Sequence, residues 1–249
     1  MSVPLAAAVG VVAFLYSSVG HAGATGYIAV LTLAGLPPAV IRPTALVLNV
    51  IVATIGTAAF ARAGHFRSAL FLPLAVASVP CAALGGSITL PTVAFERALA
   101  VVLLASAARL VGQARHPQSP PVALPGRLGR RARRSVILAA LGAGIGLLSG
   151  LTGVGGGVFL SPVLLALDVA PLKTVAATSA AFILVNSLAG LAGGIAAGRG
   201  FGEAGPSLVA AAALGGLAGS VSGAFRLPVP MLRLLLAAVL VVAGVKLLG

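Results

Sequence analysis

The polar side chains that could bind a ligand gather around two glycine-rich stretches in apolar sequence. The first is SSVGHAGATGY at residues 17–27, and the second is LSGLTGVGGGVFL at residues 148–160. Each glycine lowers helix propensity by about 1 kcal/mol, so both stretches predict a broken helix. The freed N–H groups, and the helix N-terminus that follows each break, create a positive potential suited to an anion. The two stretches therefore predict a site for a small anionic substrate.

Hydroxyl and amide groups near the breaks complete the predicted lining, because they can donate to an oxyanion without burying a charge. The predicted substrate-binding residues are Ser18, His21, Gly23, Thr25, Tyr27, Asn49, Ser149, Thr152, Gly155, Gly156, Gly157, Ser179 and Asn186. For each Ser or Thr taken singly, the alternative is a hydrogen bond back to its own helix. Thr44, Ser17, Ser161 and Thr178 lie nearby with the same two alternatives.

Two ionisable residues close to the breaks each leave two interpretations open. His21 can take up a proton near neutral pH, or it can stay neutral and link two helices. Arg42 can attract anions, or it can mark a helix end. The carboxylates Glu96, Asp168 and Glu203 all sit near predicted helix ends. A mid-membrane carboxylate for a cation site is therefore not expected.

Other chemistries do not fit these residues. A phosphate-binding loop needs a Lys directly after its last glycine, and Val158 follows Gly157. An intramembrane enzyme needs a nucleophile–base pair or paired carboxylates, and a metal site needs clustered His and Cys. None of these patterns is present, so the sequence predicts no enzyme, no metal and no cofactor. Cys81 is the single cysteine and predicts a packing role.

The composition is that of a membrane protein. Of the 249 residues, 59% are hydrophobic and only 8% are charged, whereas a soluble domain has about a quarter charged. Apolar runs near 20 residues recur along the chain, the length that crosses a bilayer as a helix. They are continuous rather than alternating, which argues against a barrel. The predicted fold class is an all-α polytopic membrane protein.

One basic, proline-rich segment at residues 113–134 divides the chain near its middle. It predicts a cytoplasmic loop that contacts anionic lipids, in line with the positive-inside rule. Stacking aromatic residues are lacking there, so nucleic-acid binding is not expected. The segment separates an N-terminal membrane repeat (1–112) from a C-terminal one (135–249).

The two halves resemble each other in sequence. Besides the paired breaks, AALGG occurs at residues 82–86 and again at 212–216. The predicted segments are 3–36 (interrupted), 39–61, 68–90 and 95–112, then 135–168 (interrupted), 171–197, 205–225 and 229–248. These make about eight spans, with the first helix of each half broken. An even number per half predicts parallel repeats with both termini cytoplasmic, but a re-entrant piece in each interrupted segment would make the halves inverted.

Other glycines recur every four residues and predict close helix packing rather than a ligand site. They are Gly142, Gly146 and Gly150 in one helix, and Gly215, Gly219 and Gly223 in another.

Over essentially its whole length the chain resembles a divergent subgroup of the TauE/SafE sulfite exporter family, also called the 4-toluene sulfonate uptake permeases, and the more specific motifs lie in the second half. The resemblance is carried by the GxGGGxxxxP pattern ending at Pro162, and by Pro171, Lys173, Ala176 and Ser179 spaced P-x-K-x-x-A-x-x-S. The first half departs from it, with VGHAGATGY in place of the triple glycine and Ala29 in place of Pro162. The resemblance implies a transporter of sulfite, sulfonates or related sulfur-containing or carboxylate anions in the bacterial inner membrane. A non-transporting scaffold or assembly factor is the alternative, and a homo-oligomer is compatible with either.

Overall fold

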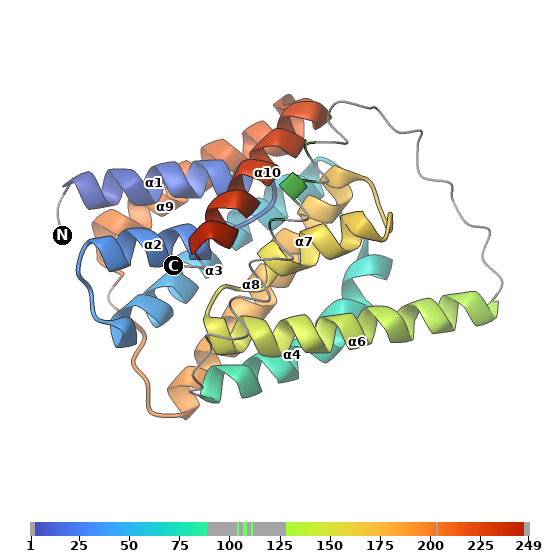
Figure 1. The fold of residues 1–249 in the computed structure, drawn as a ribbon, viewed down its shortest axis with the longest axis horizontal. Helices are drawn as coiled ribbons and strands as arrows, with labels where there is room; N and C mark the ends of the chain where they lie inside the picture. Colours follow the sequence, from blue (N-terminus) through green and yellow to red (C-terminus); the bar gives the residue numbers. More distant parts are fainter. Residues whose placement is uncertain are drawn as a thin grey trace.

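The computed structural model describes residues 3–88, 104, 107–108, 111, 128–202 and 204–246, and these residues form helices joined by short connections (Figure 1). In chain order the helices are α1 (Val3–Ser18), α2 (Ala24–Leu33), α3 (Pro38–Arg62), α4 (Ser68–Ser87), α6 (Leu128–Thr152), α7 (Gly157–Ala166), α8 (Leu172–Ala196), α9 (Pro206–Val221), the π-helical turn η1 (Ser222–Arg226) and α10 (Val229–Lys246).

In the part of the chain that the structure describes, five helices are long and apolar enough to cross a membrane. They are Ala39–Arg62, Ser68–Ser87, Ser135–Thr152, Leu172–Ala196 and Pro206–Arg226. A polytopic α-helical membrane protein is therefore confirmed as the fold class. Most of the segment predicted at 95–112 lies outside the described residues, so the count of eight spans stays a prediction. Of the predicted linker 113–134, residues 113–127 lie outside the described residues, and 128–134 form the first turns of α6.

Both predicted helix breaks are present. The first separates α1 from α2 at residues 19–23, and the second separates α6 from α7 at residues 153–156. Glycines in the left-handed region make both turns, at φ 79° and 107° in Gly20 and Gly23 and at 78° and 81° in Gly155 and Gly156. After each break the chain turns back, so that α1–α2 and α6–α7 are two helical hairpins (Figure 1).

The rows of glycines at every fourth residue pack helix against helix, as predicted. Those on α6 lie against main-chain carbonyls of α4, pairing Gly142 with Leu74, Gly146 with Ser78 and Gly150 with Ala82. Those on α9 and η1 lie against carbonyls of α1, pairing Gly215 with Gly10, Gly219 with Phe14 and Gly223 with Ser18. A methyl group on any of these glycines would collide with main chain, which cannot swing aside as a side chain can.

These pairs also give the helix directions. Residue numbers rise together in α4 and α6, and together in α1 and α9, so each pair runs parallel. They run oppositely in α3 and α8, where Asn49 meets Ser187 and Gly56 meets Ala180. Val52 and Gly56 face Gly216 and Ser220, so α3 is also parallel to α9. Hence α1, α3 and α9 run one way, and α4, α6 and α8 run the other.

The expected parallel arrangement of the corresponding helices is therefore wrong. Each broken segment returns to the end of the bundle from which it started, so it adds no net crossing. As a result α1 and α6 run in opposite directions, as do α3 and α8 (Figure 1). The helices α1 and α6 consequently begin at opposite ends of the bundle (Figure 1). This differs from the expectation that the N-terminus and the segment 113–134 share one side.

Candidate functional site

The two breaks meet inside the bundle. Nε2 of His21, in the first break, lies 3.0 Å from the carbonyl oxygen of Gly157, where α7 begins after the second break. A carbonyl oxygen can only accept, so Nε2 carries the proton of this bond. The ring is 2% exposed, and its other nitrogen, Nδ1, has no hydrogen-bond partner. His21 thus links the two hairpins through Nε2, while its Nδ1 has no hydrogen-bond partner.

The N-terminus of α7 is enclosed by polar side chains from two other helices and from the end of α6. A Cβ built on Gly155 would lie 2.8 Å from Asn49 Nδ2 and 3.0 Å from Ser187 Oγ. Asn49 Nδ2 donates at 3.4 Å to Ser187 Oγ and at 3.5 Å to the carbonyl of Val154. Ser149 lies beside Gly156, since a Cβ there would be 3.2 Å from Ser149 Cβ. Glycine is required at Gly155 and Gly156 both for backbone angle and for space.

Four residues predicted to bind substrate carry a buried polar atom without a partner. Among the described residues these atoms are His21 Nδ1, Tyr27 Oη, Asn49 Oδ1 and Ser149 Oγ. Leaving a buried polar atom unpaired costs about 1–3 kcal/mol, so such atoms are typical of places that bind a ligand or ordered water. Thr57 Oγ1 and Ser220 Oγ, on α3 and α9, also lack partners and were not predicted.

Other predicted residues make satisfied contacts within the protein. Ser18 donates to Leu15 O at 2.7 Å and Thr152 to Leu148 O at 2.8 Å, which is the back-bonding alternative. Thr25 donates to Tyr16 Oη at 2.9 Å, and Ser179 pairs with Ser161 at 2.8 Å. The amide of Asn186 accepts from Ser78 and donates at 2.9 Å to Phe182 O. Gly23 caps α2 at φ 107°, with Tyr27 packed beside it.

The basic residues nearest the breaks bind the ends of helices. Arg42 Nη2 donates to the carbonyls of Gly150 and Gly85, in the last turns of α6 and α4. Lys173 Nζ donates at 3.2 Å to the carbonyl of Ala224 in η1, which continues α9. Positive charges at helix C-termini offset the partial negative charge there. Of the two alternatives for Arg42, the contacts are those of a helix-end residue.

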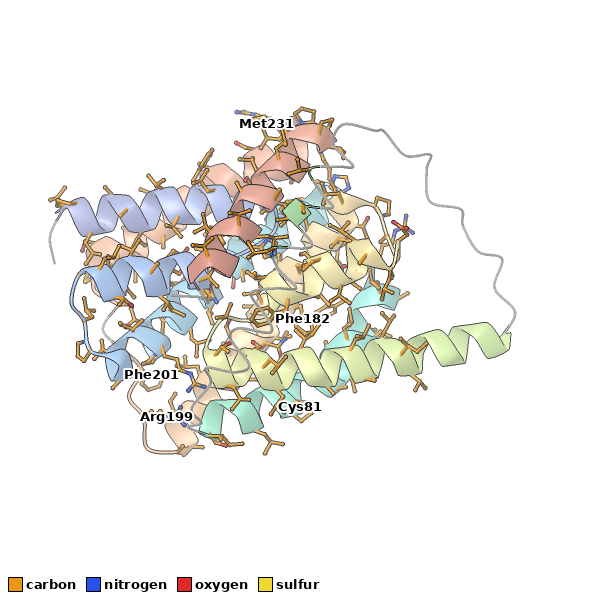
Figure 2. The ribbon with its side chains drawn as sticks, viewed as in Figure 1. Cys81, Phe182, Arg199, Phe201 and Met231 are labelled. Carbon is orange, nitrogen blue, oxygen red and sulfur yellow. The ribbon has the colours of Figure 1, made fainter. Side chains whose placement is uncertain are left out.

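Apolar side chains flank the same helix N-terminus. A Cβ on Gly156 would lie 2.9 Å from the ring of Phe182, and one on Gly155 would lie 2.9 Å from Cγ2 of Ile183. Both side chains are fully or almost fully buried, and Figure 2 places Phe182 in the middle of the bundle. The site therefore combines main-chain and neutral polar groups with an apolar wall. No group of His, Cys, Asp and Glu in the described part of the chain could hold a metal ion.

Ser187 is not among the site residues predicted from sequence, and the sequence leaves the role of Arg42 open between two alternatives. The available signal for Ser187 is a hydroxyl in an apolar helix, directly after Asn186. The structure turns Ser187 towards Asn49, at 3.4 Å.

Apolar spanning helices folded around two meeting re-entrant hairpins are the architecture of a polytopic membrane transporter. The chain belongs to the sulfite exporter TauE/SafE family, whose model matches residues 5–247. It is also similar to a probable membrane transporter protein, y4hK, of Sinorhizobium fredii, with 39% identity covering 99% of this chain and 98% of that protein. No solved structure matches the chain. The family and this relative are membrane transporters rather than enzymes, so the chain is a multi-pass membrane transporter.

Proposed function

We propose that this protein is a secondary transporter of small anions, and that the anion binds where the two breaks meet. The observation that carries this proposal is the junction of His21 and Gly157, beside the unpartnered buried hydroxyl of Ser149, which can donate to an anion. Main-chain N–H groups at the start of α7 supply the positive potential. Sulfite and organosulfonates are the first anions to test, because the matching family is described as sulfite exporters.

The two halves, 1–112 and 135–249, would act as inverted repeats around this site, joined by the linker 113–134. Support comes from the reciprocal packing, with α6 of the second half on α4 and α1 of the first half on α9. Inverted repeats place a substrate site near the bilayer midplane between two discontinuous helices. Alternating access then follows from rocking one half against the other.

We further propose that the end of the bundle at which α6 begins is cytoplasmic, in the bacterial inner membrane. This end carries Arg62, Arg67, Lys173 and Arg226, and α6 begins there with residues 128–134 of the basic segment, whereas Arg42 and Arg199 lie towards the other end. Basic residues are enriched in cytoplasmic loops, where they also meet anionic lipids. The N-terminus would then lie outside, and α10 runs back towards that same side (Figure 1).

Cysteine labelling in a Cys81→Ala background tests this orientation. We expect Ser119→Cys to react only after a membrane-permeant reagent or cell lysis, and Ser2→Cys to react in intact cells. Reaction of both positions in intact cells, or of both only after lysis or a membrane-permeant reagent, would place them on the same side and refute the inverted arrangement.

Transport into proteoliposomes tests the function. We expect saturable uptake of labelled sulfite or an organosulfonate, measured with and without a pH gradient, because His21 is the titratable group at the junction. Ser149→Ala should lower the affinity, since it removes a buried hydroxyl beside Gly156. Ser87→Ala is the matched control, because Ser87 is exposed and donates only to Leu84 in its own helix. No flux of any anion with folded protein would favour a scaffold or assembly factor.

A further inference from the structure

Among the described residues, the permanently charged side chains nearest the two breaks, Arg42 and Lys173, are engaged at helix ends. Arg42 donates to the carbonyls of Gly150 and Gly85, and Lys173 donates to that of Ala224. Each C-terminal helix end carries a partial charge near −0.5. The guanidinium of Arg42 bonds two such ends, α6 and α4, which together offset about one positive charge. The ammonium of Lys173 is engaged at the end of η1 in the same way.

What remains for a ligand is a partial positive charge. The N-terminus of α7 supplies about +0.5, and that of α2, which begins three residues after His21, supplies at most the same again. These ends can offset about one negative charge together. The N-terminus of α7 also has an independent mark of a ligand site, because the buried Ser149 lies beside Gly156 and its hydroxyl, which can donate to an anion, has no partner.

A second negative charge would have no counterpart in this site. Phe182 and Ile183 pack directly against the second break, so the dielectric constant there is low and an uncompensated charge is strongly disfavoured. Asn49 and Ser187 are neutral and already share a hydrogen bond. His21 uses its Nε2 proton on Gly157, which leaves Nδ1 as an acceptor while the ring is neutral.

We propose that the site selects for charge, accepting monovalent anions and rejecting divalent anions of the same size. This inference rests on the proposed function for the identity of the site, and it narrows the substrate class. Organosulfonates with a single sulfonate group and the monoprotonated form of sulfite fit the rule. Sulfate and disulfonates do not.

A series of compounds of nearly equal size but different charge tests the inference at constant pH. Dimethyl sulfone is neutral, methanesulfonate carries one negative charge, and sulfate carries two. Binding is measured by thermal stabilisation of the purified full-length protein, because a ligand that binds the folded state raises its unfolding temperature. Transport is measured separately by counterflow in proteoliposomes.

We expect methanesulfonate to bind roughly a hundredfold more tightly than sulfate, and dimethyl sulfone to bind weakly. Equal binding of sulfate and methanesulfonate would overturn charge selection and would leave anion transport standing. Equal binding of dimethyl sulfone would overturn it as well, since the site would then not sense charge. Preference for methanesulfonate without any flux would overturn the proposed transport function and leave charge selection standing. Absence of binding by all three compounds would overturn the site.

Arg42→Gln separates this explanation from one in which Arg42 binds the anion itself. Because the guanidinium belongs to the ends of α4 and α6, the variant should keep the wild-type ratio of methanesulfonate to sulfate affinity, even where its stability falls. A ratio that rises at least tenfold would mean that Arg42 faces the ligand. The conclusion that only the helix N-termini offset the charge of the anion would then be wrong.

Discussion

Gly156→Ala is the substitution that most directly tests how the second break is built. Gly156 caps α7 in the left-handed region, at φ 81°, where a Cβ costs about 1–2 kcal/mol. The new methyl group would also lie 2.9 Å from the ring of Phe182 and 3.2 Å from Ser149 Cβ. Overpacking in a tight core costs a further 1–3 kcal/mol or so. The expected loss of folding free energy is therefore about 2–5 kcal/mol.

Gly198→Ala is the matched control for backbone strain. Gly198 follows α8 at φ 79°, and a Cβ there would meet nothing within 4 Å. The control should therefore lose only the strain contribution of about 1–2 kcal/mol. Both variants are compared by thermal unfolding in detergent and by the stabilisation that a saturating anion adds.

The two variants should differ in anion binding as well as in stability. Gly156→Ala moves Ser149 and the first N–H groups of α7, so it should lose most of the anion-induced stabilisation. Gly198→Ala should keep it, because a Cβ on Gly198 would meet nothing within 4 Å and so would not displace Ser149 or the start of α7. If the two variants lose stability equally and both keep anion binding, the tight packing assigned to the second break is wrong.

Two further predictions concern the parts of the fold that hold the breaks in place. Gly146→Ala should destabilise the protein by about 1–3 kcal/mol, because its methyl group meets the main chain of Ser78. Gly144→Ala is the control on the same helix: Gly144 is exposed and a Cβ there meets nothing within 4 Å, so this variant should be neutral or slightly stabilising. Equal unfolding temperatures of the two variants would contradict the packing of α6 on α4. Arg42→Lys keeps the charge but shortens the side chain whose Nη2 donates to both carbonyls, so it should lower the free energy of unfolding by about 1.5–3 kcal/mol. An unchanged temperature of thermal unfolding would show that these two bonds add little to stability.

The class of fold and both breaks could be predicted from sequence because they depend on local composition. Long apolar runs have few alternatives to spanning helices, and consecutive glycines with Pro162 disfavour an uninterrupted one. The packing glycines were also predictable, since a spacing of four residues places them on one face. Each of these features follows from residues close together in the chain.

Helix direction could not be predicted in the same way. Hydrophobicity gives the length of a segment but not whether the chain crosses the membrane or turns back within it. A break of a few residues between two helices is compatible with a bend as well as with a hairpin. The tertiary contacts that decide the matter, such as Gly150 with Ala82 and Gly219 with Phe14, join residues far apart in sequence.

The two helix breaks are not packed alike. Asn49 on α3 and Asn186 on α8 are both buried amides, yet Asn186 is satisfied by Ser78 and Phe182, whereas Asn49 keeps an unpartnered oxygen. The difference arises because α4 offers a hydroxyl to Asn186, while Asn49 finds only the long bonds to Ser187 and Val154. His21 adds to the asymmetry, since the second break has Gly153–Gly157 and no ring of its own. The packing around the breaks is therefore unequal: Asn186 is committed to contacts within the bundle, whereas Asn49 keeps a buried polar atom without a partner.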